Sequence, residues 1–133
     1  MIVVDTSALM AILLGEPAGD ACADRLAGES EVLISAGTLA ESLIVSARRN
    51  IGPEMSALVD ELGFEVVALS AAGAARVAEA YARWGKGAHP AALNFGDCFA
   101  YALARETATP LLFVGDDFTH TDVAPALTGG ARP

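Results

Sequence analysis

The chain has 133 residues, and its 17 acidic against eight basic side chains give a formal net charge of −9. Its 53% hydrophobic and 19% charged residues exclude a disordered chain and predict one compact domain with a buried core. A charge of −9 with Lys86 as the only lysine argues, taken alone, against a nucleic-acid partner.

Short apolar runs alternate with longer helical patterns, which is typical of an α/β fold with a mostly parallel sheet. Asp5, Thr6 and Ser7 end the first run with residues suited to cap a helix. In chain order, the pattern predicts a strand over 2–4, helices over 8–14 and 18–27, a strand over 32–34, helices over about 37–50 and 54–62, a strand over 64–69, a helix over about 71–84, a loop over 85–93, a helix over about 95–106 and a strand over 111–114.

This order, βααβααβααβ, predicts a three-layer α/β/α domain over residues 1–128 followed by a flexible tail over 129–133. No uncharged run exceeds ten residues, whereas a membrane helix needs roughly 18 apolar ones, so we expect no membrane segment. The first basic residue is Arg25, so the N-terminus lacks the basic region of a secretory signal. With only Cys22 and Cys98 as cysteines, we expect a cytoplasmic protein with two buried thiols and no disulfide framework.

Three acidic residues come directly after predicted strands. Asp5 follows the first strand, and Asp116 and Asp117 follow the last. Because the carboxyl ends of parallel strands meet at one edge of a sheet, we expect these residues to converge there.

Two further acids lie on helices in mostly apolar surroundings. Glu41 is the only charge within residues 38–47, on a helix that we expect to be mostly buried, so its carboxylate needs a cation. Asp97 lies in the first turn of a predicted core helix, where the helix dipole favours a carboxylate.

Each acid also has a purely structural interpretation. Asp5 could cap the first helix, Asp97 could close a capping box with Asn94, Glu41 could face solvent, and the acid pair after the last strand could form a turn. Convergence favours a shared cation instead, because several carboxylates cannot all stay ionised in one pocket without one. Oxygen ligands alone suit Mg²⁺ or Mn²⁺, and clustered-acid sites that hold such ions serve mainly phosphoryl chemistry.

Four parts of the chain, in their order and spacing, carry a family resemblance: Ile2–Leu9, Glu41, Leu93–Ala102 and Leu112–Asp122. Together they resemble PIN-domain proteins and, more narrowly, VapC-type ribonuclease toxins. The resemblance implies a PIN-like fold and an Mg²⁺- or Mn²⁺-dependent endoribonuclease that cleaves structured RNA such as tRNA or rRNA. It also implies a homodimer that is inhibited by a small VapB-type antitoxin in a heterotetramer or larger assembly.

The resemblance also assigns site residues. The acidic quartet of the family falls on Asp5, Glu41, Asp97 and Asp117, with the adjacent Asp116 as a helper or the alternative fourth acid. Asp5 and Asp97 would be direct metal ligands, whereas Glu41 and Asp117 would bind the metal directly or through water and orient the nucleophile.

Other polar residues are candidates for RNA contacts. Thr6 or Ser7 could bond a metal-bound water or the scissile phosphate, or serve only the helix cap. Arg83 and Lys86 flank the loop over 85–93 and could contact phosphates, or belong to an ordinary solvated loop. Because the charge outside the quartet is still negative, we expect weak, metal-dependent RNA binding and an antitoxin that supplies its own arginines.

Three alternatives compete with this interpretation. A phosphoacceptor receiver domain needs an acid pair after its first strand and a lysine after its last, and neither is present. A haloacid-dehalogenase-like phosphatase needs a second aspartate where this chain has Ser7. A catalytically inactive PIN fold that serves only as a binding module is the main alternative, although all four acids are present.

Overall fold

The computed structural model describes residues 1–127, and its elements follow the predicted order βααβααβααβ. The predicted domain end at 128 and tail over 129–133 lie outside the described residues. The elements are β1 (Ile2–Val4), α1 (Thr6–Leu13), α2 (Gly19–Ala27), β2 (Val32–Ser35), α3 (Ala36–Arg48), α4 (Gly52–Leu62), β3 (Glu65–Val67), α5 (Ala71–Trp84), α6 (Phe95–Glu106) and β4 (Leu111–Leu112).

The four strands form one parallel sheet in the order β3-β2-β1-β4. Each of the first three strands is followed by two helices that return the chain to the same end of the sheet, as parallel pairing requires. The carboxyl ends of β1 and β4 are therefore neighbours, which confirms that the sheet brings the segments containing Asp5 and Asp116 to one edge.

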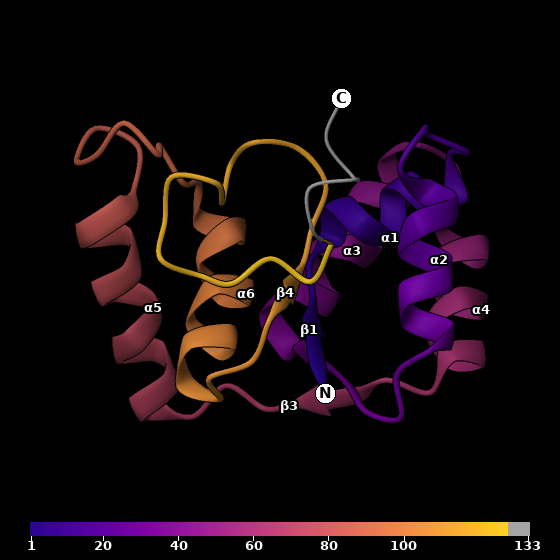
Figure 1. Ribbon diagram of the computed structural model, residues 1–133, viewed down its shortest axis with the longest axis horizontal. Helices are drawn as coiled ribbons and strands as arrows, with labels where there is room; N and C mark the ends of the chain where they lie inside the picture. The colour runs from indigo at the N-terminus through magenta and orange to yellow at the C-terminus, as the bar shows by residue number, and fades with distance from the viewer. Residues whose placement is uncertain (128–133) are drawn as a thin grey trace.

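Helices cover both faces of the sheet, which confirms the three-layer α/β/α architecture (Figure 1). Val3 and Leu111 face a core that they share with α5 and α6, whereas Val4 and Leu112 face α1, α2 and α4. Helix α3 contacts both α1 and α6. No helix within residues 1–127 has the length and apolar character that crossing a bilayer requires.

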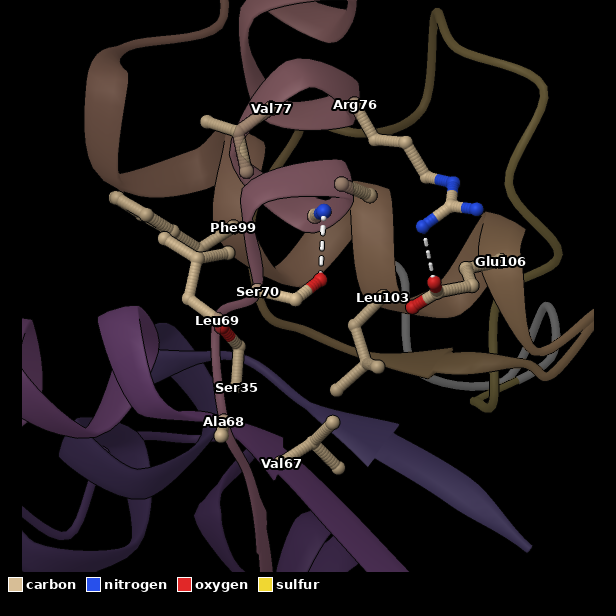
Figure 2. A pocket seen from close by; sticks show the side chains of 12 residues that line it. Ser35, Val67, Ala68, Leu69, Ser70, Arg76, Val77, Phe99, Leu103 and Glu106 are labelled. Carbon is tan, nitrogen blue, oxygen red and sulfur yellow. Dashed lines mark hydrogen bonds and ion pairs between the residues drawn. The ribbon is translucent and has the colours of Figure 1, made fainter.

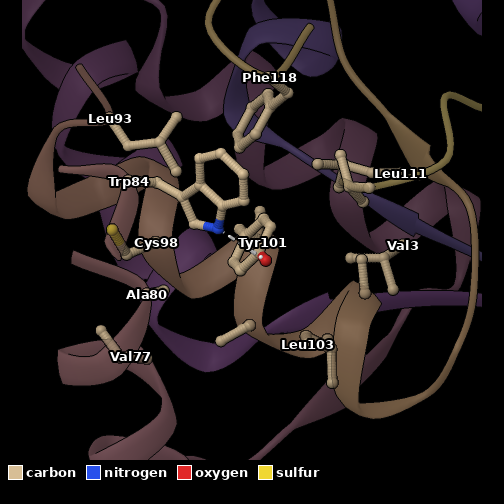
Figure 3. Close-up of a cluster of buried hydrophobic side chains, with 14 of the residues drawn as sticks. Val3, Val77, Ala80, Trp84, Leu93, Cys98, Tyr101, Leu103, Leu111 and Phe118 are labelled. Atoms are coloured by element: carbon tan, nitrogen blue, oxygen red, sulfur yellow. Dashed lines mark hydrogen bonds between the residues drawn. The ribbon is translucent and has the colours of Figure 1, made fainter. Parts of the chain in front are cut away.

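Hydrogen bonds link the core beside α5 and α6, where Trp84 and Tyr101 meet (Figure 3), to Asp122 in the segment after β4. The buried Trp84 donates its indole N–H to the Tyr101 Oη at 2.9 Å, and Tyr101 donates to the Asp122 Oδ1 at 2.5 Å. Burial and the bond to Asp122 raise the pKa of Tyr101. Asp122 thus has a structural role. Both cysteines are buried, as predicted.

Two strands are shorter than predicted. β3 spans three residues within 64–69, and β4 ends at Leu112 rather than at 114. The Val114 N–H donates to the Ser7 Oγ at 3.0 Å instead of to a neighbouring strand. Beside β4, Leu111 exchanges backbone hydrogen bonds with Ala124 and Ala126.

The prediction that α3 is mostly buried is wrong. Ile44 is 60% exposed and Leu43 is 39% exposed, whereas the buried residues of the helix are Thr38, Ser42 and Ser46. The Ser42 Oγ donates to the Thr38 carbonyl at 2.9 Å, so this hydroxyl is hydrogen-bonded although it is buried. The small buried side chains let α3 pack closely against its neighbours.

Candidate active site

Asp5 lies at the carboxyl end of β1 and is the N-cap of α1, with 3% of its surface exposed. Its Oδ2 accepts the Ser7 N–H at 3.0 Å and the Ser7 hydroxyl at 2.7 Å, whereas its buried Oδ1 has no hydrogen-bond partner within residues 1–127. Burial raises the pKa of Asp5 to about 7 against the lowering effect of the Ser7 bonds, and repulsion from Asp97 and Glu41 adds to the rise. One oxygen therefore caps the helix, and the other is available to a ligand.

Asp97 also caps a helix and belongs to the acidic cluster. It forms the expected capping box with Asn94, whose N–H donates to the Asp97 Oδ2 at 3.0 Å and whose Oδ1 accepts the Asp97 N–H at 2.8 Å. Burial raises the pKa of Asp97 to about 6; the Asn94 bond lowers it, and repulsion from Asp117 and Glu41 raises it.

Glu41 is half-buried and is held by a hydroxyl from another helix. The Thr6 Oγ1 donates to the Glu41 Oε1 at 2.7 Å and lies 2.9 Å from the Ser42 Oγ. Thr6 and Ser42 are themselves buried, so α1 fixes one carboxylate oxygen of a residue on α3.

Two glycines let α3 and α6 approach each other at Glu41. A Cβ at Gly96 of α6 would overlap the Glu41 Oε2, and a Cβ at Gly37 of α3 would overlap the Phe99 ring of α6. The Glu41 carboxylate thus lies against the helix that carries Asp97. The roles of Gly96 and Ser42, and the bond from Thr6 to Glu41, were not predicted from the sequence. A glycine inside a predicted helix is the one signal in the sequence that indicates a close approach.

Asp116 and Asp117 follow β4 and are both exposed. Repulsion from Asp117 contributes to the raised pKa of Asp97, which places Asp117 electrostatically within the cluster. The Asp116 carbonyl accepts the Thr119 N–H at 3.1 Å and its hydroxyl at 2.7 Å, so Asp116 opens a turn. These contacts favour Asp117 as the fourth acid, and the assignment stays a prediction.

No basic side chain neutralises this cluster in the part of the chain that the structure describes. The ion pairs found there engage Glu29, Glu106 and Asp122 instead. Across residues 1–127, no three acidic, histidine or cysteine side chains are arranged so that they could hold a metal ion. The carboxylates would have to draw closer to share one.

The donor set nevertheless fits a hard divalent cation. Its donors are carboxylate oxygens, the Oδ1 of Asp5 is buried without a partner, and mutual repulsion helps to raise the pKa values of Asp5 and Asp97. A bound cation would give the Asp5 Oδ1 a partner and would reduce the repulsion between the carboxylates.

Three of the four residues expected to contact RNA have side-chain partners within the protein. The Thr6 and Ser7 hydroxyls bond Glu41 and Asp5. Arg83 lies 3.9 Å from the Asp122 carboxylate and stacks over Trp84, with its guanidinium carbon 4.7 Å from the ring centroid. Lys86 is exposed in the loop between α5 and α6. For all four, contact with RNA stays a prediction.

A cleft of about 240 Å³ lies apart from the acids, between α5, α6 and the segment after β3 (Figure 2). Phe99, Leu69 and Val77 line it, and an ion pair between Arg76 and Glu106 lies at its side. None of the five acids lines this cleft, so it is not the candidate active site.

Comparison with known proteins shows the family. The sequence model of the PIN domain matches residues 2–124. The chain is 45% identical over 131 residues to ribonuclease VapC42 of Mycobacterium tuberculosis, a match that covers 95% of this chain and 99% of VapC42. It is 44% identical over 126 residues to ribonuclease VapC36 of the same species, covering 91% and 90% of the two chains.

The chain belongs to the VapC ribonucleases of the PIN-domain family. It is thus a hydrolase that acts on RNA and a toxin of a toxin–antitoxin system, and the receiver-domain and dehalogenase alternatives are excluded.

Two solved structures have the same fold as this VapC-type chain. VapC20 of M. tuberculosis, described as a sarcin–ricin-loop-cleaving toxin, superposes with a TM-score of 0.71 at 21% identity, covering 94% of this chain and all of VapC20. A toxin–antitoxin complex from Klebsiella pneumoniae gives a TM-score of 0.71 at 16% identity, covering 96% and 98% of the two chains.

Proposed function

We propose that this VapC ribonuclease is an endoribonuclease that hydrolyses phosphodiester bonds of structured RNA, tRNA or rRNA, with Mg²⁺ or Mn²⁺ held by Asp5, Glu41, Asp97 and Asp117. One observation carries the proposal. Carboxylates from the end of β1, α3, α6 and the segment after β4 lie without a basic partner among the described residues, and burial together with their mutual repulsion raises the pKa values of Asp5 and Asp97.

Each of the candidate residues would have its own role in such a site. Asp5 offers its unpartnered Oδ1 while Ser7 holds the other oxygen, and Asp97 is fixed by its capping box with Asn94. Thr6 holds Glu41 in place for binding the cation or orienting the attacking water. A bound divalent cation supplies charge neutralisation and activates water for attack on the scissile phosphate.

The proposal includes a protein partner. We expect a homodimer and inhibition in the cytoplasm by a VapB-type antitoxin, in a heterotetramer or larger assembly. A cluster of carboxylates without basic neighbours suits an antitoxin that presents arginines to it, since a guanidinium pairs with carboxylates in a bidentate way. Arg83 and Lys86, on or near the α5–α6 loop, are the side chains that we expect to contact RNA phosphates.

The function is tested by incubating the purified protein with total bacterial RNA, with Mg²⁺, with Mn²⁺ or with EDTA, and sequencing the cleaved ends. We expect new ends at defined positions of tRNA or rRNA only when a divalent cation is present. The Asp97→Asn variant should produce none of them. Equal cleavage in EDTA, or by this variant, would contradict the proposal.

One observation favours the alternative of a catalytically inactive binding module: no metal-holding arrangement exists among the acids of residues 1–127. Thermal melting with and without Mn²⁺ separates the two functions. A competent site is stabilised because the cation binds only the folded state, whereas an inactive module keeps the same Tm.

A further inference from the structure

Phe95 is an exposed aromatic residue beside the acids. It is the first residue of α6, and 68% of its surface is exposed, more than for any other large hydrophobic residue that the structure describes. It directly precedes Gly96, on which the Glu41 carboxylate lies, and it comes two residues before Asp97. The backbone of Phe95 is therefore at the edge of the candidate active site.

The orientation of this ring is set by a second aromatic residue. Phe95 and Phe99 meet edge to face, with ring centroids 4.9 Å apart and planes at 80°. Phe99 in turn fits against the backbone of Gly37 on α3, where a Cβ would overlap it. Phe95 thus rests on a packed neighbour while most of its own surface stays open.

The charge of the protein explains why such a residue is useful at this place. Ion pairs with phosphates usually supply most of the affinity for RNA, but the net charge here is −9 and the acids have no basic partner among the described residues. With so few basic side chains to contact phosphates, RNA must be held largely by the cation and by uncharged contacts. A base stacked on an aromatic ring is such a contact, because every base has a π-face whatever its sequence.

We infer that Phe95 is a stacking platform for an unpaired base next to the scissile phosphate. The inference rests on the proposed function and deepens it by naming a residue that would position an unpaired or extruded nucleotide at the cleaved bond. Bases in a continuous duplex are already stacked on their neighbours and are not free to cover the ring. The place of Phe95 in the chain, directly before Gly96 and two residues before Asp97, favours a base over a protein surface as the occupant.

A binding measurement tests the inference without requiring cleavage. The probe is a short uridylate oligonucleotide with one 2-aminopurine, whose uridine neighbours stack weakly, either single-stranded or annealed to its complement, in buffer with Mg²⁺. We expect the wild-type protein to quench the single strand and not the duplex. Phe95→Ala and Phe95→Leu should lose the quenching, and Phe95→Tyr should keep it. Tyr81→Ala, which removes an exposed aromatic ring from α5, is the matched control and should quench like the wild type.

Kinetics on an RNA fragment that the wild type cleaves provide the second measurement. Phe95→Ala should raise KM about tenfold with little change in kcat, since a stacked base contributes equally to the bound ground state and the transition state. Quenching without cleavage would refute the proposed function alone. The inference would be overturned if the wild type did not quench the probe, or if Phe95→Leu quenched it as well as the wild type does. A change of oligomeric state in Phe95→Ala would also overturn it, because the ring would then belong to an interface between copies.

Discussion

The Glu41 carboxylate of α3 lies against the backbone of Gly96 on α6, in space that any larger residue at position 96 would fill with its Cβ. The contact brings an acid from one helix to the start of another, one residue before Asp97. The candidate site therefore depends on a glycine as much as on its acids.

Gly96→Ala should displace Glu41 and leave the fold intact, because the overlapping atoms are at the end of a flexible side chain. A misplaced catalytic group costs on the order of 100-fold in rate, so we expect metal-dependent RNA cleavage to fall by about this factor at an unchanged Tm. Gly28→Ala is the matched control, since its Cβ would make only ordinary contacts at 3.6 Å. Full activity of Gly96→Ala would show that Glu41 has no role.

Thr6→Val should weaken catalysis through Glu41. The substitution keeps the shape of the side chain and removes the 2.7 Å hydrogen bond to the Glu41 Oε1. Loss of a group that orients a metal ligand costs about 10- to 100-fold in metal affinity or activity. The measurement is kcat together with the Mn²⁺ concentration at half-maximal rate, and Thr6→Ser, which retains the hydroxyl, should restore both. Equal loss in the serine variant would point to packing rather than to the bond.

The stability of the metal-free protein should fall as pH rises. The pKa of Asp5 is raised by burial to about 7 from an ordinary value of 3.8, so the unfolded chain releases this proton at lower pH than the folded one. The stabilising proton is fully present below about pH 4 and is lost as pH rises through about 7. Asp5→Asn removes this dependence.

Thermal melting in EDTA over this pH range provides the measurement. The Tm of Asp5→Asn should exceed that of the wild type by several degrees at about pH 8, with the difference shrinking towards about pH 4. Glu54→Gln, on the exposed first turn of α4, is a suitable control that should follow the wild type. A constant offset between Asp5→Asn and the wild type at every pH would contradict the raised pKa.

The two adjacent acids after β4 should differ in importance. Asp117 acts on Asp97 electrostatically, whereas Asp116 opens a turn through its backbone carbonyl, which a side-chain substitution leaves in place. Asp117→Asn should therefore reduce RNA cleavage at least about tenfold, and Asp116→Asn should have only a small effect. The reverse order in a cleavage assay would assign the fourth position to Asp116.

The element order and the convergence of the acids were predictable from local patterns. Apolar runs and turn residues mark each strand and helix, and parallel pairing then determines which strand ends meet. The caps at Asp5 and Asp97 were also visible, because capping residues act on their own helix. The structure shows that both residues cap a helix and also belong to the acidic cluster.

Contacts between distant elements were not predictable. The close approach of Gly96 to Glu41 and the bond from Thr6 depend on how α1, α3 and α6 pack. The prediction that α3 is mostly buried was wrong because the small hydroxyl residue Ser42 is hydrogen-bonded within the helix and can be buried, while the larger Ile44 is exposed. Hydrophobic periodicity predicts that the large apolar residues of a helix are buried, so it cannot predict a buried Ser42 and an exposed Ile44.

The claim that these carboxylates hold a catalytic cation is tested most directly by titrating Mn²⁺ calorimetrically into the wild-type protein and its Asp97→Asn variant at neutral pH. The account predicts saturable binding by the wild type with release of protons from the acids, and binding weakened at least about tenfold in the variant. Equal Mn²⁺ affinity in the two proteins, or no binding by the wild type, would contradict it.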